Sequence, residues 1–229
     1  RESETREREI ISVIQKKIQT LNLARINLIN SPGLVDIRPF TSRGWRERVY
    51  YSYIMILEND FFLHASYGAR KTFRRASKQG ISVKNEYNPD IFWKLAVSTY
   101  DKQKMDVPYT KDHIVTFMEM LIRNNLGEMW IAYTSSGEPA SAVVIIYDPH
   151  MAHGWLGVND PRFKDTGVVT FLLVETFKDL QNRGFQRFNI MAANTPHLAK
   201  FYSSFNPLLV PYYGLEKTTG LGKLFTMFR

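Results

Sequence analysis

The order of the elements predicted after Gly127 constrains the fold more than any other feature of this sequence. Three short segments rich in β-branched and aromatic residues come first, and turns separate them, so they predict a meander of strands. In chain order the predicted elements are strands at 128–133, 140–147 and 151–158, a helix at 166–182, a strand at 188–191, a helix at 196–204 and a strand at 208–215. Strands that meander and then alternate with helices predict a mixed α/β sheet rather than a bundle or a sandwich.

The first 125 residues also mix helices and strands. The predicted helices are 2–21, 68–79, 89–105 and 110–124, and the predicted strands are 23–29, 49–57 and 81–84. Thr110 is the predicted N-cap of the last helix. In the first helix one apolar stripe is expected to face the core, formed by Ile10, Ile11, Ile14, Ile18 and Leu21. Since no clear linker follows, we predict two halves, 1–125 and 126–229, that share an interface.

Composition excludes several classes of protein. Hydrophobic residues make up 44% of the 229 residues, which is enough to bury a core. The chain lacks the run of roughly 18 apolar residues that a membrane span needs, so no stable membrane insertion is expected. Cysteine is absent, which excludes disulfides and a thiol nucleophile and fits a reducing compartment. Because the chain also starts with charged residues rather than a secretory signal, we expect a cytoplasmic protein.

The charge balance favours anionic partners. Thirty Lys and Arg residues against 22 Asp and Glu residues give a net charge of +8, which fits phosphates, nucleic acid or simply a basic soluble protein. Five cations share one face of the predicted helix 68–79, namely Arg70, Lys71, Arg74, Arg75 and Lys78. This stripe either guides a phosphate-rich substrate or is a solvated face. It contains no interleaved aromatic residues, so specific single-strand recognition is not indicated.

The loop Lys164-Asp165-Thr166-Gly167-Val168-Val169-Thr170 leads from a predicted strand into a long helix. Unpaired N–H groups at the start of a helix suit a pyrophosphate, and Gly167 would let the backbone approach it closely. The alternative is an ordinary turn between a strand and a helix, and Asp165 favours that alternative because a carboxylate repels phosphate.

Residues 126–217 resemble the GNAT acyltransferase superfamily, whose Gln/Arg-x-x-Gly-x-Gly/Ala loop binds the pyrophosphate of acyl-CoA. Lys164-x-x-Gly167-x-Val169 is an imperfect copy of that loop. Segments in the order of the FemAB-like branch strengthen the resemblance. They are 36–40 with Gly44-Trp45, 70–76, 99–103 with Pro108, 137–140, 201–206 and 210–213.

The resemblance implies a GNAT fold with a partial second GNAT-like half at the N-terminus, and transfer of an acyl group to an amine. The expected function is an N-acyltransferase that uses acyl-CoA, such as acetyl-CoA, on an amine-bearing small molecule or a cell-wall precursor. A FemAB-type aminoacyltransferase that uses aminoacyl-tRNA on a peptidoglycan precursor is the first alternative, and a non-catalytic GNAT-fold binding module is the second. Tyr202 favours a thioester donor, since GNAT enzymes often have a tyrosine there to protonate the thiolate.

The resemblance also implies where the site residues lie. An N–H group near Gly157–Asn159 would hold the carbonyl oxygen, and Tyr202 would be the acid. His153 is expected on the same strand face as Trp155 and Gly157 and is the candidate base, or else a structural histidine. Asp160 and Glu128 are weaker candidates. The predicted donor contacts are Val158, Lys164, Thr166, Gly167, Val168 and Asn194, with capping as the alternative for Asn194, and the predicted substrate contacts are Arg74, Gln103 and Tyr109. The five scattered histidines suggest no metal site.

Overall fold

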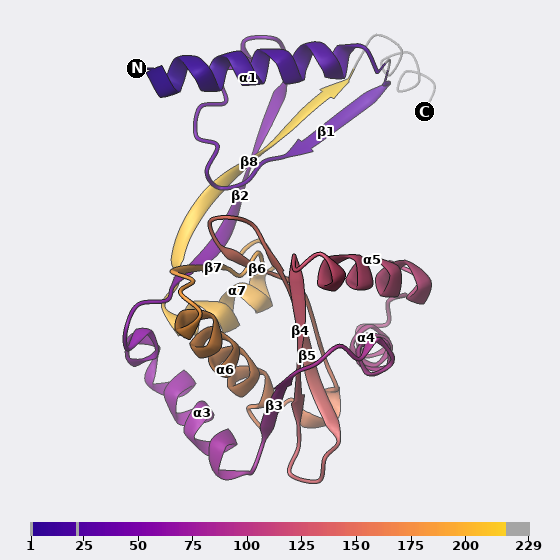
Figure 1. Cartoon of the computed structure of the whole chain (residues 1–229), viewed down its shortest axis with the longest axis vertical. Helices are drawn as coiled ribbons and strands as arrows, with labels where there is room; N and C mark the ends of the chain where they lie inside the picture. The colour runs from indigo at the N-terminus through magenta and orange to yellow at the C-terminus, as the bar shows by residue number, and fades with distance from the viewer. Residues whose placement is uncertain (1, 22, 219–229) are drawn as a thin grey trace. The chain divides into compact units, whose positions relative to one another are not determined.

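The computed structural model describes residues 2–21 and 23–218, which form two compact units (Figure 1). Of the described residues, the first unit contains 2–21, 23–52 and 210–218, and the second contains 53–209. Strands β2 (Arg46–Ile56) and β8 (Leu208–Thr218) contribute residues to both units. Within the described ranges no helix has the length and apolar character needed to cross a membrane.

The first unit is built on the antiparallel pairing of β1 (Arg25–Ile29) with β8. Helices α1 (Glu2–Gln19) and α2 (Arg38–Thr41) complete it. A small core contains Ile11, Ile26, Phe40, Trp45 and Leu215. The predicted stripe of α1 is only partly buried: Ile11 lies in this core and Ile18 packs against it, whereas Ile10, Ile14 and Leu21 are exposed.

The second unit carries the sheet predicted from the order of the elements. In chain order its elements are η1 (Phe61–His64), α3 (Tyr67–Lys78), β3 (Ser82–Asn85), α4 (Pro89–Lys102), α5 (Lys111–Arg123), β4 (Gly127–Tyr133), β5 (Pro139–Tyr147), β6 (Ala152–Asn159), η2 (Pro161–Phe163), α6 (Val168–Asn182), β7 (Arg187–Asn189), α7 (Pro196–Tyr202) and η3 (Ser203–Phe205). The strand order is β7-β6-β5-β4-β3, and the end of β2 pairs with β7. Only β6 and β7 run parallel among these described pairs. The predicted mixed α/β architecture is confirmed.

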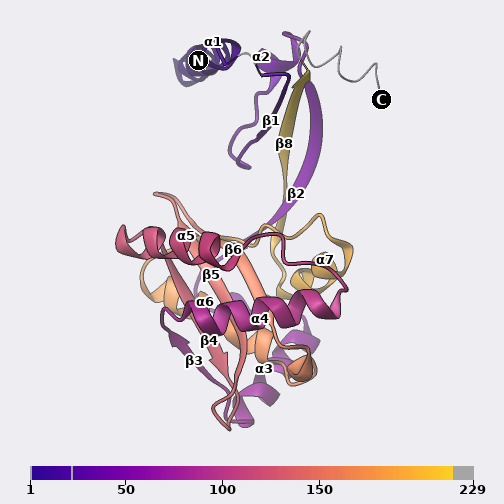
Figure 2. The same cartoon turned by 90° about the vertical axis from the view of Figure 1, so that its right-hand side faces the viewer.

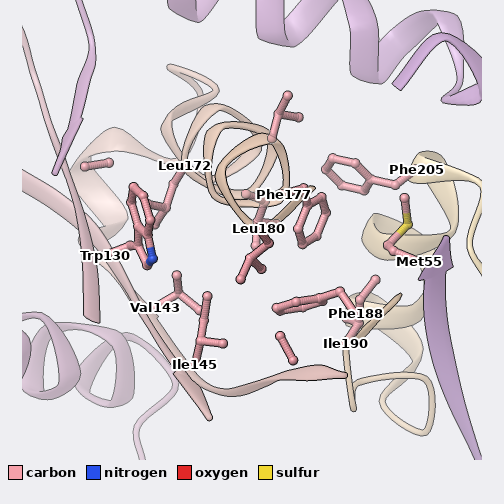
Figure 3. Packing of buried hydrophobic residues seen from close by; sticks show 14 of the residues in the cluster. Met55, Trp130, Val143, Ile145, Leu172, Phe177, Leu180, Phe188, Ile190 and Phe205 are labelled. Carbon is pink, nitrogen blue, oxygen red and sulfur yellow. The ribbon is translucent and has the colours of Figure 1, made fainter. Parts of the chain in front are cut away.

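Helices cover both faces of this sheet, with α3 and α6 on one face and α4 and α5 on the other (Figures 1 and 2). Helix α6 buries Leu172, Phe177 and Leu180 over the sheet, where Val143 and Ile145 of β5 meet them (Figure 3). Burying several large apolar side chains of one helix stabilises the fold, at about 1.5–3 kcal/mol for each fully buried side chain. The sheet therefore holds its strand ends rigidly in place.

The opposite face is closed by α4 and α5. Phe92 of α4 and Met118 of α5 bury against Met129 of β4 and Val144 of β5. The predicted cap of α5 is confirmed, because the Thr110 side chain accepts a hydrogen bond from the His113 N–H at 3.3 Å. This packing places both helices in the same unit as the meander, so the unit limits differ from the predicted halves 1–125 and 126–229.

Candidate active site

The parallel strands β6 and β7 separate almost as soon as they meet. Their pairing covers only Ala152↔Phe188 and His153↔Asn189, while β6 continues to Asn159. At Gly154 a Cβ atom would lie 3.0 Å from the Phe188 ring, so the glycine lets the two strands pack closely at this point. Beyond Gly154 the described part of the sheet offers β6 no partner on that edge. Since β7 itself ends at Asn189, the rest of β6 has an unpaired edge, and we call the space beside this edge the wedge.

Gly157 lines the open part of this wedge. Asp160 donates its N–H to the Ala140 carbonyl of β5 at 2.9 Å. Because hydrogen bonds alternate along an antiparallel pair, Val158 also faces β5, whereas Gly157 and Asn159 point their N–H groups toward the wedge. No atom of the described residues lies within 4 Å of a Cβ built on Gly157. The alternation thus makes Gly157, rather than the predicted Val158, the residue with an outward N–H beside open space.

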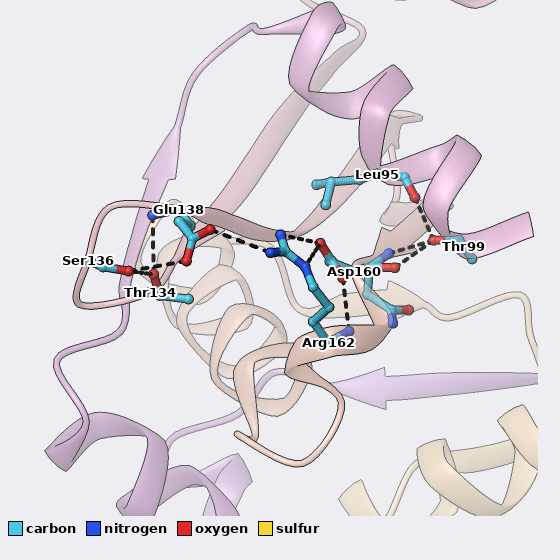
Figure 4. A network of polar contacts seen from close by, with 8 residues as sticks. Leu95, Thr99, Thr134, Ser136, Glu138, Asp160 and Arg162 are labelled. Atoms are coloured by element: carbon cyan, nitrogen blue, oxygen red, sulfur yellow. Dashed lines mark hydrogen bonds and ion pairs between the residues drawn. The ribbon is translucent and has the colours of Figure 1, made fainter. Parts of the chain in front are cut away.

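The neighbouring N–H group of Asn159 is already occupied. It donates to Thr99 Oγ1 of α4 at 2.9 Å, and the same hydroxyl lies 2.8 Å from the Leu95 and Asn159 carbonyl oxygens (Figure 4). Thr99 therefore fixes the end of β6 to α4. Thr99 is not predictable as a site residue from the sequence, because a threonine inside a helix carries no local signal of a contact with a distant strand.

The expectation that His153, Trp155 and Gly157 share one face is wrong. The register shifts between Val144 and Ile145, and Trp155 is the extra residue of a bulge in β6. A bulge changes the side on which the following residues lie. Trp155 stays with His153 on the face of α4 and α5, where it packs on Phe117 with ring centroids 4.8 Å apart, whereas Gly157, after the bulge, pairs with Val143 on the face covered by α6.

His153 lies where β6 and β7 separate and is held at both ring nitrogens. Its Nε2 is 2.7 Å from Asp148 Oδ2, and its Nδ1 is 3.3 Å from Asn189 Nδ2. Asn189 Oδ1 accepts the Met191 N–H, so its amide nitrogen is the group that faces His153. Nε2 is then the donor to Asp148, and Nδ1 carries the lone pair. Both partners escaped the sequence analysis.

The Asp148 carboxylate is set up to stay ionised. Burial raises its pKa, but hydrogen bonds from the His150 N–H, the His153 ring and the Met151 N–H outweigh burial and hold the pKa below its usual value. An ionised carboxylate at Nε2 orients the imidazole ring.

The two weaker candidate bases are engaged elsewhere. Asp160 binds Arg162 at 2.8 Å and caps η2, and the hydrogen bond from Arg162 lowers the pKa of Asp160 (Figure 4). Glu128 binds Arg183 at 2.8 Å and accepts a hydrogen bond from Asn85. These ion pairs stabilise the turn after β6 and the end of α6, and neither carboxylate is placed to accept a proton from a substrate.

The start of α6 is packed more tightly than expected. Gly167 is its N-cap, with a left-handed φ of 85°. A Cβ at Gly167 would lie 2.7 Å from the Thr72 side chain and 3.4 Å from Ala76, both in α3. The glycine therefore accommodates a neighbouring helix on that side. Val168 is buried and donates its N–H to Thr166 Oγ1, so the available N–H groups of the first turn are those of Val169 and Thr170.

Helix α3 brings cations to this corner. Arg75 Nη2 donates to the Asp165 carbonyl at 2.6 Å. The Lys164 ammonium is exposed, 4.0 Å from the Asp165 carboxylate, which itself points into solvent with 90% of its side chain exposed. Arg74 is also exposed. Of the predicted basic stripe, Arg75 is the member in contact with the predicted donor loop.

Tyr202 ends α7 and packs, half-buried, against the α6 side of the sheet, the same side on which Gly157 is open. Burial raises the pKa of Tyr202 to about 12. Gln103 and Tyr109 flank the connection between α4 and α5 on the opposite face, where the buried Tyr109 hydroxyl has no hydrogen-bond partner among the described residues. The N-cap position of α7 is Thr195, whose side chain makes no cap hydrogen bond, and the exposed Asn194 comes directly before it.

Comparison with known proteins agrees with this geometry. The family model described as an acetyltransferase (GNAT) domain matches residues 66–197, which is more than half of the chain. The chain therefore belongs to the GNAT acetyltransferase family, and it is an acyltransferase. No curated protein matches.

Solved structures give the finer likeness. The chain is similar to FemX with a TM-score of 0.79 at 9% identity, covering 96% of this chain and 79% of that one. It is also similar to the C-terminal domain of a putative lysylphosphatidylglycerol synthetase from Agrobacterium fabrum, with a TM-score of 0.67 at 14% identity over 96% and 76% of the two chains. A tandem GNAT protein from the clavulanic acid biosynthesis pathway follows, with a TM-score of 0.56 at 10% identity over 92% and 69%. The resemblance to the FemAB-like branch is thus confirmed at the level of the fold.

Proposed function

We propose that this protein is an N-acyltransferase that binds the acyl group of its donor in the wedge between β6 and β7. The observation that carries the proposal is Gly157, whose N–H points into the wedge beside open space. Negative charge develops on the carbonyl oxygen when an amine attacks it, and a fixed N–H donor stabilises that charge. A donor that cannot rotate away contributes this stabilisation without reorganisation.

The two faces of the wedge would have different tasks. His153, on the face of α4 and α5, takes the proton of the attacking amine at Nδ1, after the amide of Asn189 moves aside. The ionised Asp148 then stabilises the charged ring. Tyr202, on the face of α6, gives a proton to the leaving atom. The acceptor would enter from the face where Gln103 and Tyr109 lie.

We propose acyl-CoA as the donor. Its phosphates would lie at the corner of α3 and α6, against the N–H groups of Val169 and Thr170, with Lys164 and Arg75 beside them. Thr72 fills the space on one side of Gly167, so the phosphates would lie on the other side. The acceptor is an amine-bearing small molecule or a cell-wall precursor, and the proposed place of the reaction is the cytoplasm.

A second candidate is aminoacyl transfer from tRNA. The exposed cations of α3, among them Lys71, Arg74 and Lys78, continue from the same corner and would follow a polynucleotide backbone. This alternative uses the same wedge and the same groups for proton transfer, and it differs only in what holds the donor.

Calorimetric titration of acetyl-CoA separates the two donors. Binding in the micromolar range that weakens about tenfold in Arg75→Gln, and not in Arg74→Gln, supports the CoA donor. Binding of aminoacyl-tRNA that weakens in Arg74→Gln and falls steeply with salt, without acetyl-CoA binding, supports the alternative. A protein that binds neither donor overturns the proposed function.

A further inference from the structure

A basic hollow in the first unit lies outside the acyltransferase wedge. It has a volume of about 440 Å³, and its lining residues are Arg8, Ser12, Gln15, Arg38, Pro39, Ser42 and Arg43. Three of these side chains are guanidinium groups and two are hydroxyls. Helix α1 supplies one wall, and the segment around α2 supplies the other.

One guanidinium is positioned by a buried amide. Gln15 is only 2% exposed, and its Nε2 donates to the Pro39 carbonyl at 2.9 Å. Its Oε1 accepts a hydrogen bond from Arg43 Nη1. Because Gln15 is buried, its side chain has little conformational freedom. Its amide oxygen therefore holds the Arg43 guanidinium in one position at the hollow.

The other two guanidiniums share one carboxylate. Arg38 binds Asp36 through Nε at 2.7 Å and through Nη2 at 2.9 Å, and Arg8 Nε lies 3.5 Å from the same carboxylate. The hydrogen bond from Arg38 lowers the pKa of Asp36 to about 2, so the carboxylate is ionised at neutral pH. Three positive charges and one negative charge leave the hollow with a net charge of +2.

We propose that this hollow binds the phosphate group of a phosphate ester. Guanidinium groups match the geometry of phosphate oxygens, and the hydroxyls of Ser12 and Ser42, which have no partner among the described residues, can donate to the same oxygens. The hollow is larger than a single phosphate and accepts part of the ester as well. The phosphate belongs either to a free metabolite or to a lipid headgroup. This site stands independently of the proposed acyl transfer.

Titration of the full chain with inorganic pyrophosphate tests the site directly. We expect at least tenfold weaker binding in Arg43→Gln and in Ser42→Asp. Ser42→Asp adds a negative charge without removing any protein contact. If its unfolding curve matches that of wild type, a loss of pyrophosphate binding cannot come from misfolding. Lys17→Gln removes a charge from the same helix outside the hollow and should bind within twofold of wild type.

A flotation assay distinguishes the two sources of phosphate. A lipid headgroup is indicated if vesicles containing phosphatidylglycerol bind the wild type but not Ser42→Asp. Vesicles of phosphatidylcholine should then bind neither protein. Pyrophosphate binding without vesicle binding indicates a free ester. The proposal is overturned if the wild type binds neither probe, or if both variants bind as the wild type does.

Discussion

Two glycines in the second unit, Gly157 near the end of β6 and Gly167 at the N-cap of α6, differ in what surrounds them. Gly157 has open space where a side chain would be, and its backbone torsions are ordinary for a strand. Gly167 has a φ of 85° and faces Thr72 and Ala76 at close range. One glycine leaves space for a ligand, and the other leaves space for a helix.

The difference teaches that a glycine in a presumed binding loop is no evidence of a ligand by itself. A left-handed φ and a close helix both require glycine at position 167 for folding. Neither requirement holds at position 157. Substitution at Gly167 therefore tests the fold, and substitution at Gly157 tests the wedge.

The largest expected effect is that of Gly167→Ala on stability. A left-handed alanine costs about 1–2 kcal/mol, and overlap with Thr72 adds a similar amount. We expect the free energy of unfolding in urea to fall by about 3 kcal/mol. Gly33→Ala, where the nearest atom is 3.7 Å away, should change it by less than about 0.5 kcal/mol. If Gly167→Ala is as stable as wild type but binds the donor more weakly, Gly167 serves the ligand rather than the fold.

Gly157→Ala should leave stability unchanged and lower activity. The methyl group meets no protein atom, so the free energy of unfolding should stay within about 0.5 kcal/mol of wild type. The methyl group would occupy the wedge beside the N–H donor and displace the acyl group. We expect kcat/KM to fall about 100-fold, which equals about 2.7 kcal/mol. Steady-state kinetics with the confirmed donor measures this loss. Unchanged kinetics would show that the acyl group binds elsewhere.

Much of the fold could be predicted because local rules and packing agree. Thr110 caps α5 as expected, the predicted strands β4, β5 and β6 all form, and β4 and β5 are largely buried. The stripe of α1 failed in part because Ile10 and Ile14 line an open hollow beside β1 and stay largely exposed. Periodicity predicts which residues share a helix face, and it does not say how much of that face another element covers.

The site was less predictable because its main features depend on strand register and on contacts between residues that are far apart in the sequence. The bulge at Trp155 has no signature in the alternation of residues, yet it separates His153 from Gly157. Arg75 reaches the Asp165 carbonyl across 90 positions of sequence. Loop 164–170 was predicted from its place before a helix and Tyr202 from the family resemblance, and only the structure showed which sides of them are covered.

Tyr202→Phe probes the face on which Gly157 is open. Removing an acid should lower kcat about 30-fold if the leaving group needs its proton. The raised pKa of Tyr202, about 12, keeps the hydroxyl protonated, so Tyr202 should cause no fall in kcat between pH 8 and pH 10. Because the folded pKa exceeds the unfolded one, stability falls as the pH rises from 10 toward 12, and Tyr202→Phe should remove that part of the fall. A phenylalanine variant with full activity would leave Tyr202 a packing residue.

Asp148→Asn probes the other face and has the smallest expected effect on catalysis. The amide is a weaker partner for the His153 ring than the carboxylate, so the proposed base is held less well and kcat/KM should fall about tenfold. The depressed pKa of Asp148 contributes stability above about pH 4 that is lost as the pH falls through the folded value, so the variant should be less stable at pH 7 and more nearly equal to wild type at low pH. His153→Gln provides the matched test. If both variants lose stability while keeping the rate and pH profile of wild type, the Asp148–His153 pair only joins β6 to its neighbours, and the amine proton leaves by another route.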